Sequence, residues 1–239
     1  LAELIGNTPL FRPQRWLESH GSPEANFAFK LEALNPSGSV KDRAALGMIL
    51  DLEERGILKP GATIIEPTSG NTGVSLAALS SSRGYTAILV LPDTMTQERR
   101  DLLQSYGARL VLTPGTEGMK GAIRKAEELQ AEIPGAIIPS QFTNPANPAY
   151  HERSTGPEIW EQMEEKVDVL VVGVGTGGTL TGAGRYLRAK NPALEIVAVE
   201  LAASAVLSGE APGKHTIQGI GAGFVPDVMD MGIVDEVVT

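Results

Sequence analysis

NPSGSVKDR, residues 35–43, joins a strand-like run to an apolar helical run and decides how the rest of the chain is interpreted. Ser39 and Asp42, just before the apolar residues 44–50, form the pattern of a capping box, which predicts a helix with Ser39 as its cap. Lys41 would then lie in the first turn, where the free amides and the helix dipole disfavour an ammonium. We therefore expect a lowered pKa for Lys41 and a nucleophilic amine that can condense with an aldehyde.

The composition excludes several classes of protein. A chain of 239 residues with 42% hydrophobic residues can build one large or two modest domains. The net charge of -9 argues against general binding to nucleic acid or to anionic membranes. The absence of cysteine excludes disulfides, thiolate metal sites and a cysteine nucleophile, and fits a cytoplasmic protein. No apolar run could span a bilayer and no signal peptide is visible, although a leader removed before Leu1 stays an open alternative.

Strand-like and helix-like runs alternate along the chain. Gly84 is the expected end of a helix over 72–83, and Thr96 is the expected cap of the next helix. This alternation predicts an α/β fold with parallel sheets covered by helices. Two prolines make residues 144–148 the best candidate for a domain boundary. Strands are expected at residues 27–31, 63–66, 86–91, 109–112, 137–138, 167–172, 195–199 and 233–238.

EPTSGNTG, residues 66–73, lies where a strand gives way to a helix. Its glycines let the main chain approach a ligand, and short polar side chains stand beside a helix N-terminus. This combination suits a small anion such as a carboxylate. The candidate donors are Thr68, Ser69, Asn71 and Thr72.

GVGTGGT, residues 173–179, is a second glycine-rich turn between a strand and a helix. Gly173, Gly175 and Gly178 satisfy G-x-G-x-x-G, and Glu200 follows about twenty residues later, as in dinucleotide-binding domains. A nicotinamide-dependent oxidoreductase is therefore one interpretation. The other is a cup for a terminal phosphate, because the turn also contains hydroxyls and further amides. The residues that favour a phosphate are Thr176, Gly177 and Thr179.

All three motifs follow strands of predicted parallel sheets, so they can share one crevice at the carboxyl edge. An aldehyde for Lys41, a phosphate for residues 175–179 and a carboxylate for residues 68–72 together describe pyridoxal phosphate with an amino acid.

With QFTNPANP (141–148), TGPEIW (155–160) and QGIGAGF (218–224), these motifs resemble the cysteine synthase (O-acetylserine sulfhydrylase) family along essentially the whole chain. The resemblance implies a fold type II pyridoxal phosphate enzyme, similar to the tryptophan synthase β subunit, with two doubly wound α/β domains and normally a homodimer. A smaller domain, 35–143, would carry the lysine. A larger phosphate-binding domain, 1–34 plus 144–239, would be incomplete at its C-terminus.

The resemblance also implies a role for each matching residue. Lys41 matches the lysine that binds the cofactor covalently, and Asn71 matches the residue that bonds the cofactor 3-hydroxyl. Gly219 and Gly221 fall in a loop at the mouth of the site. The phosphate loop would be Gly175, Thr176, Gly177, Gly178 and Thr179. The substrate α-carboxylate would be held at Thr68, Ser69, Asn71, Thr72 and Gln141. No metal site is implied.

The implied reaction is β-replacement, in which O-acetylserine and sulfide give cysteine and acetate with Lys41 as general base. Open alternatives are a related enzyme that uses O-phosphoserine or condenses with homocysteine, a nicotinamide oxidoreductase, and a non-catalytic binding subunit. The family also binds the C-terminus of serine acetyltransferase in this pocket. Its C-terminal serine, which faces the pyridine nitrogen, has no counterpart here, so we expect the native chain to continue past Thr239.

Overall fold

The computed structural model describes residues 1–68 and 70–239. Its α-helices are α1 (Gln14–Ser19), α2 (Lys41–Glu54), α3 (Asn71–Arg83), α4 (Gln97–Ser105), α5 (Gly118–Glu132), α6 (Ala146–Arg153), α7 (Thr155–Gln162) and α8 (Gly178–Lys190). Its strands are β1 (Leu10–Phe11), β2 (Phe29–Lys30), β3 (Thr63–Pro67), β4 (Thr86–Pro92), β5 (Arg109–Thr113), β6 (Val169–Gly173), β7 (Glu195–Val199) and β8 (Glu236–Val238). Short 3-10 helices are η1 (Ala2–Leu4), η2 (Glu32–Leu34), η3 (Gly115–Glu117) and η4 (Met231–Ile233).

The first parallel sheet has the order β3-β4-β5 and is covered by helices on both faces. Leu89 and Leu91 of β4 pack with α3 and α4, whereas Ile88 and Val90 between them pack with α5. Such burial of alternate side chains on opposite faces is typical of a central strand in an α/β sheet. Thr96 caps α4 by accepting a hydrogen bond from the Arg99 amide, which confirms the predicted start of this helix.

The second parallel sheet has the order β6-β7-β8 and packs on α8. Leu170 and Ile196 of the sheet share a core with Leu180 of the helix. Val169 and Val171 alternate with Leu170 along β6, and both are exposed. Two separate parallel sheets confirm the predicted fold class.

One sequence-based expectation, the strand over 27–31, was wrong. The predicted strand over 27–31 has only two residues, which pair antiparallel with β1 outside both parallel sheets. Residues 144–148, the candidate domain boundary, run directly into α6, with Pro145 at the cap position and Pro148 in the first turn, and the boundary stays a prediction. Proline is tolerated there because the first amides of a helix have no intrahelical acceptor.

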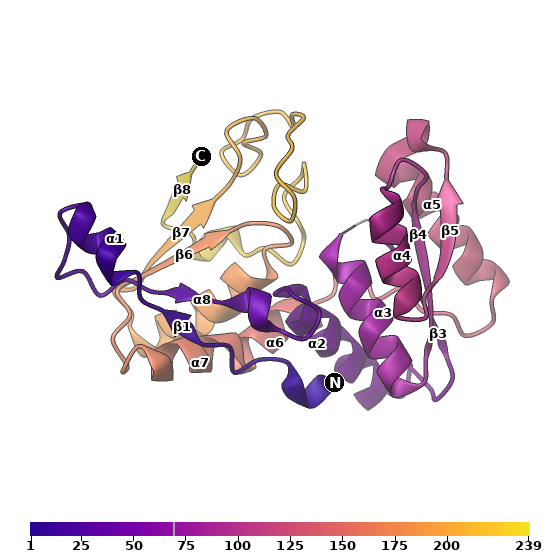
Figure 1. The fold of residues 1–239 in the computed structure, drawn as a ribbon, viewed down its shortest axis with the longest axis horizontal. Coiled ribbons are helices and arrows are strands. Elements are labelled where there is room, and N and C mark those ends of the chain that lie inside the picture. The colour runs from indigo at the N-terminus through magenta and orange to yellow at the C-terminus, as the bar shows by residue number, and fades with distance from the viewer. Residues whose placement is uncertain (69) are drawn as a thin grey trace.

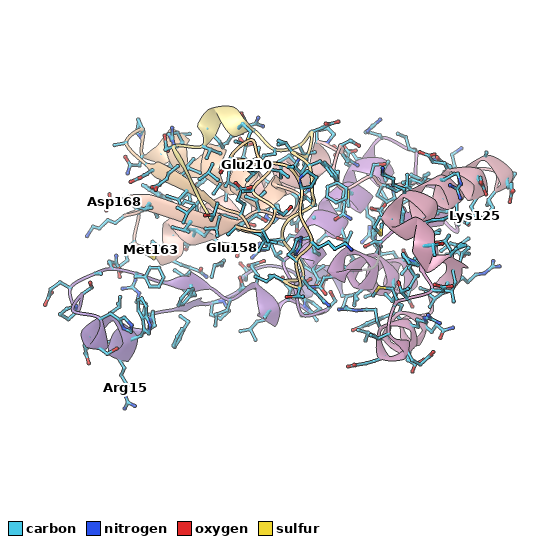
Figure 2. The ribbon with its side chains drawn as sticks, turned by 90° about the horizontal axis from the view of Figure 1, so that it is seen from above. Arg15, Lys125, Glu158, Met163, Asp168 and Glu210 are labelled. Carbon is cyan, nitrogen blue, oxygen red and sulfur yellow. The ribbon has the colours of Figure 1, made fainter. Side chains whose placement is uncertain are left out.

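Helices α2 and α6 pack closely together and lie between the two sheets (Figure 1). A Cβ added to Gly47 of α2 would lie only 2.4 Å from the Cβ of Tyr150 in α6, so the contact requires glycine. The N-terminal arm with α1 projects from the body, with Arg15 at its tip and Lys125 of α5 at the far end of the molecule (Figure 2). No helix in the described part of the chain is long and apolar enough to cross a membrane.

Candidate active site

Lys41 is the first residue of α2, as predicted, but the capping box is wrong. Val40 occupies the cap position, and no side chain caps the helix. Ser39 Oγ instead accepts a hydrogen bond from the Lys41 amide at 3.2 Å, and the Asp42 carboxylate accepts one from the Ser37 amide at 2.8 Å. Asp42 therefore fixes the loop that precedes the helix, and does not bond the amide of Ser39.

The amine of Lys41 lies beside the turn that joins β6 to α8. A Cβ added to Gly175 would be 3.7 Å from Lys41 Nζ and 2.5 Å from the carbonyl oxygen of Gly219. Three segments that are distant in the sequence therefore meet at this point. Burial lowers the pKa of Lys41 below the ordinary lysine value, which makes its neutral amine more accessible. The shift has the predicted direction, and burial is its cause.

The turn over 175–179 presents main-chain amides at the start of α8. Gly177 has a φ of +80°, which favours glycine, and α8 begins at Gly178. A Cβ on Gly178 would lie 2.1 Å from Asn147 Oδ1, so this position also requires glycine. The first amides of a helix have no intrahelical acceptor and carry positive partial charge, which suits a phosphate.

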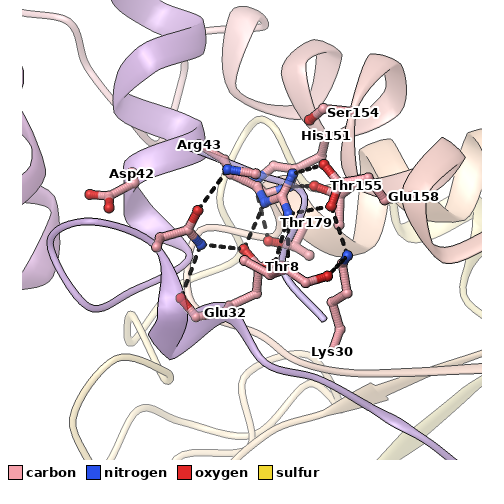
Figure 3. Close-up of polar contacts among 12 residues, drawn as sticks. Thr8, Lys30, Glu32, Asp42, Arg43, His151, Ser154, Thr155, Glu158 and Thr179 are labelled. Atoms are coloured by element: carbon pink, nitrogen blue, oxygen red, sulfur yellow. Dashed lines mark hydrogen bonds and ion pairs between the residues drawn. The ribbon is translucent and has the colours of Figure 1, made fainter. Parts of the chain in front are cut away.

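His151 is buried against the same turn, a position that the sequence did not predict. Its Nε2 lies 3.3 Å from Thr179 Oγ1, and its Nδ1 lies 2.8 Å from Thr155 Oγ1 (Figure 3). Burial, with the charges of Arg43 and Lys41, lowers the pKa of His151 to about 3. The imidazole is therefore neutral at physiological pH and links α7 to the turn. The sequence signal available for the contact between His151 and Thr155 was their i, i+4 spacing.

The predicted carboxylate turn is partly assembled. Thr72 Oγ1 donates to Gln141 Oε1 at 2.6 Å, and both side chains are buried. Thr68 Oγ1 accepts a hydrogen bond from the Gly70 amide at 3.3 Å. The structure thus joins Gln141 to a turn 69 residues earlier in the chain.

Two members of the predicted set are placed differently or lie outside the structure. Asn71 is exposed, and its Oδ1 accepts a hydrogen bond from Arg99 at 3.3 Å. Its bond to the cofactor hydroxyl stays a prediction. Ser69 lies outside the described residues.

The loop over 218–224 approaches the turn, and its place at the mouth of the site stays a prediction. The carbonyl of Gly219 faces Gly175, and the amide of Gly221 donates to the Val174 carbonyl at 2.9 Å. Gly221 has a φ of +75°, and an added Cβ would lie 2.6 Å from Leu201 Cδ1.

A buried ion cluster, here called the Arg43 cluster, consists of Thr8, Lys30, Glu32, Arg43 and Glu158 (Figure 3). Arg43 is fully buried and bonds Glu32 and Glu158, each at 2.7 Å. Burial alone would raise the pKa of Glu158, but hydrogen bonds from Arg43 and Lys30 outweigh it and lower this pKa to about 2. The cluster joins the N-terminal segment to α7 and to α2 two residues after Lys41. No local pattern could have revealed it.

The rival dinucleotide site lacks an available carboxylate. Glu200 is buried and accepts hydrogen bonds from the Leu207 amide at 2.7 Å, the Ser208 amide at 2.9 Å and the Ser208 hydroxyl at 2.6 Å. These bonds occupy the carboxylate that a ribose would need. Among residues 1–68 and 70–239, no group of three or more His, Cys, Asp or Glu side chains could hold a metal ion.

The residues around Lys41 fit pyridoxal phosphate. An amine with a lowered pKa can bind the aldehyde, and the amides and hydroxyls at the start of α8 can bind the phosphate. The glycine at 175 leaves the main chain uncovered beside the amine. The turn over 173–179 contains no acidic residue that would repel a phosphate.

Comparison with known proteins agrees with this chemistry. A cysteine synthase of Staphylococcus aureus is 52% identical over 239 residues, which cover the whole chain and 76% of that protein. The crystal structure of an O-ureido-L-serine synthase matches with a TM-score of 0.93 and 44% identity, and covers the whole chain and 74% of its own. A cysteine synthase from Entamoeba histolytica matches with a TM-score of 0.92 and 42% identity, over 99% of this chain and 70% of that one.

The family model described as "Pyridoxal-phosphate dependent enzyme" matches residues 1–239. This match covers the lysine, the glycine-rich turn and the carboxylate turn together, so the cofactor and the enzyme class predicted from the sequence are confirmed. The chain belongs to the family of pyridoxal-phosphate dependent enzymes.

Proposed function

We propose that this enzyme is a cysteine synthase, which converts O-acetyl-L-serine and sulfide to L-cysteine and acetate. The observation that carries the proposal is that a Cβ added to Gly175 would lie 3.7 Å from Lys41 Nζ, so the amine lies beside the turn that we propose binds the phosphate. The 52% identity to a cysteine synthase over the whole chain supports this choice within the family.

In this mechanism each part of the site has a separate task. Lys41 would hold the cofactor through its amine, and its free amine would act as the general base that removes the substrate α-proton. Residues 175–179 hold the phosphate, while Thr68, Ser69, Thr72 and Gln141 hold the α-carboxylate. Asn71 would bond the 3-hydroxyl, and Gly219 and Gly221 would line the entrance. Pyridoxal phosphate supplies the electron sink for loss of acetate from the β-carbon.

A related β-replacement is the second candidate, because one neighbour at a TM-score of 0.93 is an O-ureido-L-serine synthase. Such an enzyme would share the lysine and the anion sites and differ in the group that leaves or adds at the β-carbon. Use of O-phosphoserine, or condensation with homocysteine as in cystathionine β-synthase, belongs to the same class.

The test begins with the purified protein and added pyridoxal phosphate. We expect a yellow chromophore that borohydride bleaches in the wild type and that Lys41→Ala does not form covalently. Cysteine formation is then compared for O-acetylserine, O-phosphoserine and serine, each with sulfide. Faster turnover of either alternative donor would replace the proposed substrate, and the absence of a reducible chromophore would refute the cofactor assignment.

A cytoplasmic homodimer with domains 35–143 and 1–34 plus 144–239 is part of the proposal. Support for the domain division comes from the two sheets, one in each part. Support for a dimer comes from the projecting N-terminal arm, where Phe11, Trp16 and Phe29 are exposed (Figure 2). Light scattering should give twice the chain mass, and Trp16→Glu should shift it towards the monomer while Arg15→Glu does not. A monomeric wild type would contradict this part.

The pocket would also accept the C-terminal carboxylate of serine acetyltransferase, because a site for an α-carboxylate can grip a chain end. A short peptide ending in isoleucine should compete with O-acetylserine. The same peptide with an amidated C-terminus is the control and should not compete. Equal competition by both peptides would show that the carboxylate is not recognised.

A further inference from the structure

Asn147 lies between the turn proposed to bind the phosphate and the carboxylate site, within the QFTNPANP motif, for which the sequence suggested no role for Asn147 itself. It is fully buried in the first turn of α6. Its Nδ2 donates to the Gln141 carbonyl at 2.9 Å and to Thr176 Oγ1 at 3.1 Å. One amide group therefore ties together a residue proposed to hold the substrate and a residue proposed to hold the phosphate.

The orientation of this amide follows from its partners. The Gln141 carbonyl can only accept, so it must face the NH2 group and not Oδ1. As a result Oδ1 is buried beside Gly178 without a hydrogen-bond partner. An unpaired buried acceptor destabilises a fold. The arrangement therefore keeps both hydrogen bonds of Nδ2 although Oδ1 is left unpaired.

The bonds to Thr176 also determine what its hydroxyl can do. Thr176 Oγ1 accepts from Asn147 Nδ2 and from the Gly178 amide at 3.3 Å. A hydroxyl has two acceptor lone pairs and one hydrogen, so its remaining capacity is to donate. A phosphate oxygen is an acceptor, and Thr176 is thereby prepared to bind it.

We propose that Asn147 is a positioning residue that orients the Thr176 hydroxyl towards the cofactor phosphate and holds the Gln141 main chain at the substrate carboxylate. This inference rests on the proposed function. It predicts two separable effects of losing the amide: weaker binding of pyridoxal phosphate through Thr176, and weaker binding of the amino acid through Gln141.

The experiment is a double-mutant cycle on the affinity for pyridoxal phosphate. Asn147→Ala should weaken binding about tenfold, because the Thr176 hydroxyl loses the bond that orients its donor towards the charged phosphate. In the Thr176→Val background the same substitution should change the affinity less than about twofold. The KM for O-acetylserine should also rise more than kcat falls. Asn147→Ser is measured in parallel, and Asn191→Ala is the matched control, because Asn191 Nδ2 donates to the Val167 carbonyl at the far end of α8.

The possible results distinguish failure of this inference from failure of the proposed function on which it rests. A wild type that does not bind pyridoxal phosphate overturns the proposed function and this inference with it. Wild-type affinity in Asn147→Ala, or an equal loss with and without the Thr176 hydroxyl, overturns the inference alone. If neither Asn147→Ala nor Asn147→Ser folds, Asn147 has a structural role only, and the inference is overturned.

Discussion

Replacing Glu66 by glutamine is expected to remove a large part of the pH dependence of stability. Glu66 is buried at the end of β3, and its Oε2 accepts a hydrogen bond from the Ser140 amide at 3.4 Å. Ser140 has a φ of +62°, a left-handed conformation that disfavours serine. Burial raises the pKa of Glu66 to about 7, although main-chain hydrogen bonds from Ser140 and Gln141 oppose the increase. The carboxyl thus holds the segment that carries Gln141.

The magnitude follows from proton linkage. An increase in pKa from 4.5 to about 7 corresponds to roughly 3 kcal/mol at about 1.4 kcal/mol per pKa unit. The folded state binds this proton more tightly than the unfolded state does. The stabilisation is therefore complete below pH 4.5 and is lost as the pH rises through 7, with about 2.5 kcal/mol of the loss between pH 5 and pH 8. Glutamine has no charge to titrate, and it resembles the neutral carboxylic acid that Glu66 is below about pH 7.

Urea unfolding at pH 5 and pH 8 measures the effect. Between these values the wild type should lose about 2.5 kcal/mol more than Glu66→Gln. His151 acts in the opposite direction, because its lowered folded-state pKa costs stability as the pH falls below 6.5, but it is present in both proteins and cancels. The control is Glu195→Gln on an exposed position of β7, which should follow the wild type. Parallel pH profiles of wild type and Glu66→Gln would refute the reasoning.

The remaining predictions concern the lysine, the ion cluster and the start of α8. Lys41→Ala should abolish cysteine formation while circular dichroism stays that of the wild type, and retained activity would contradict its role. Arg43→Met should reduce the free energy of unfolding by about 3–5 kcal/mol, because two glutamates lose their buried partner; a loss below about 1 kcal/mol in urea would argue against the cluster. Gly178→Ala should cost about 1–3 kcal/mol by overpacking against Asn147, whereas Gly184→Ala on the same helix meets only isoleucine side-chain tips and should cost less. Equal melting temperatures of the two alanine variants would refute that comparison.

Features that depend on neighbouring residues could be predicted from the sequence. Gly84 ends α3 in the left-handed conformation at a φ of +77°, and Thr96 caps α4, because both roles involve atoms only a few residues away. The glycines of 175–179 signalled an anion site for the same reason, since a strand, a turn and a helix N-terminus follow one another directly. Regular alternation of such units was sufficient to predict parallel sheets.

The tertiary structure alone decided which distant groups meet. Arg43 and Glu158 are 115 residues apart in the chain, and Thr72 and Gln141 are 69 apart, so no spacing rule connects them. The lowered pKa of Lys41 likewise depends on the segments that bury its amine, which the local sequence does not specify. A local pattern specifies what the chain does within a turn or two. Desolvation, buried ion pairs and the partners of an amide such as that of Asn147 depend on packing between elements, and this is determined only when the whole chain has folded.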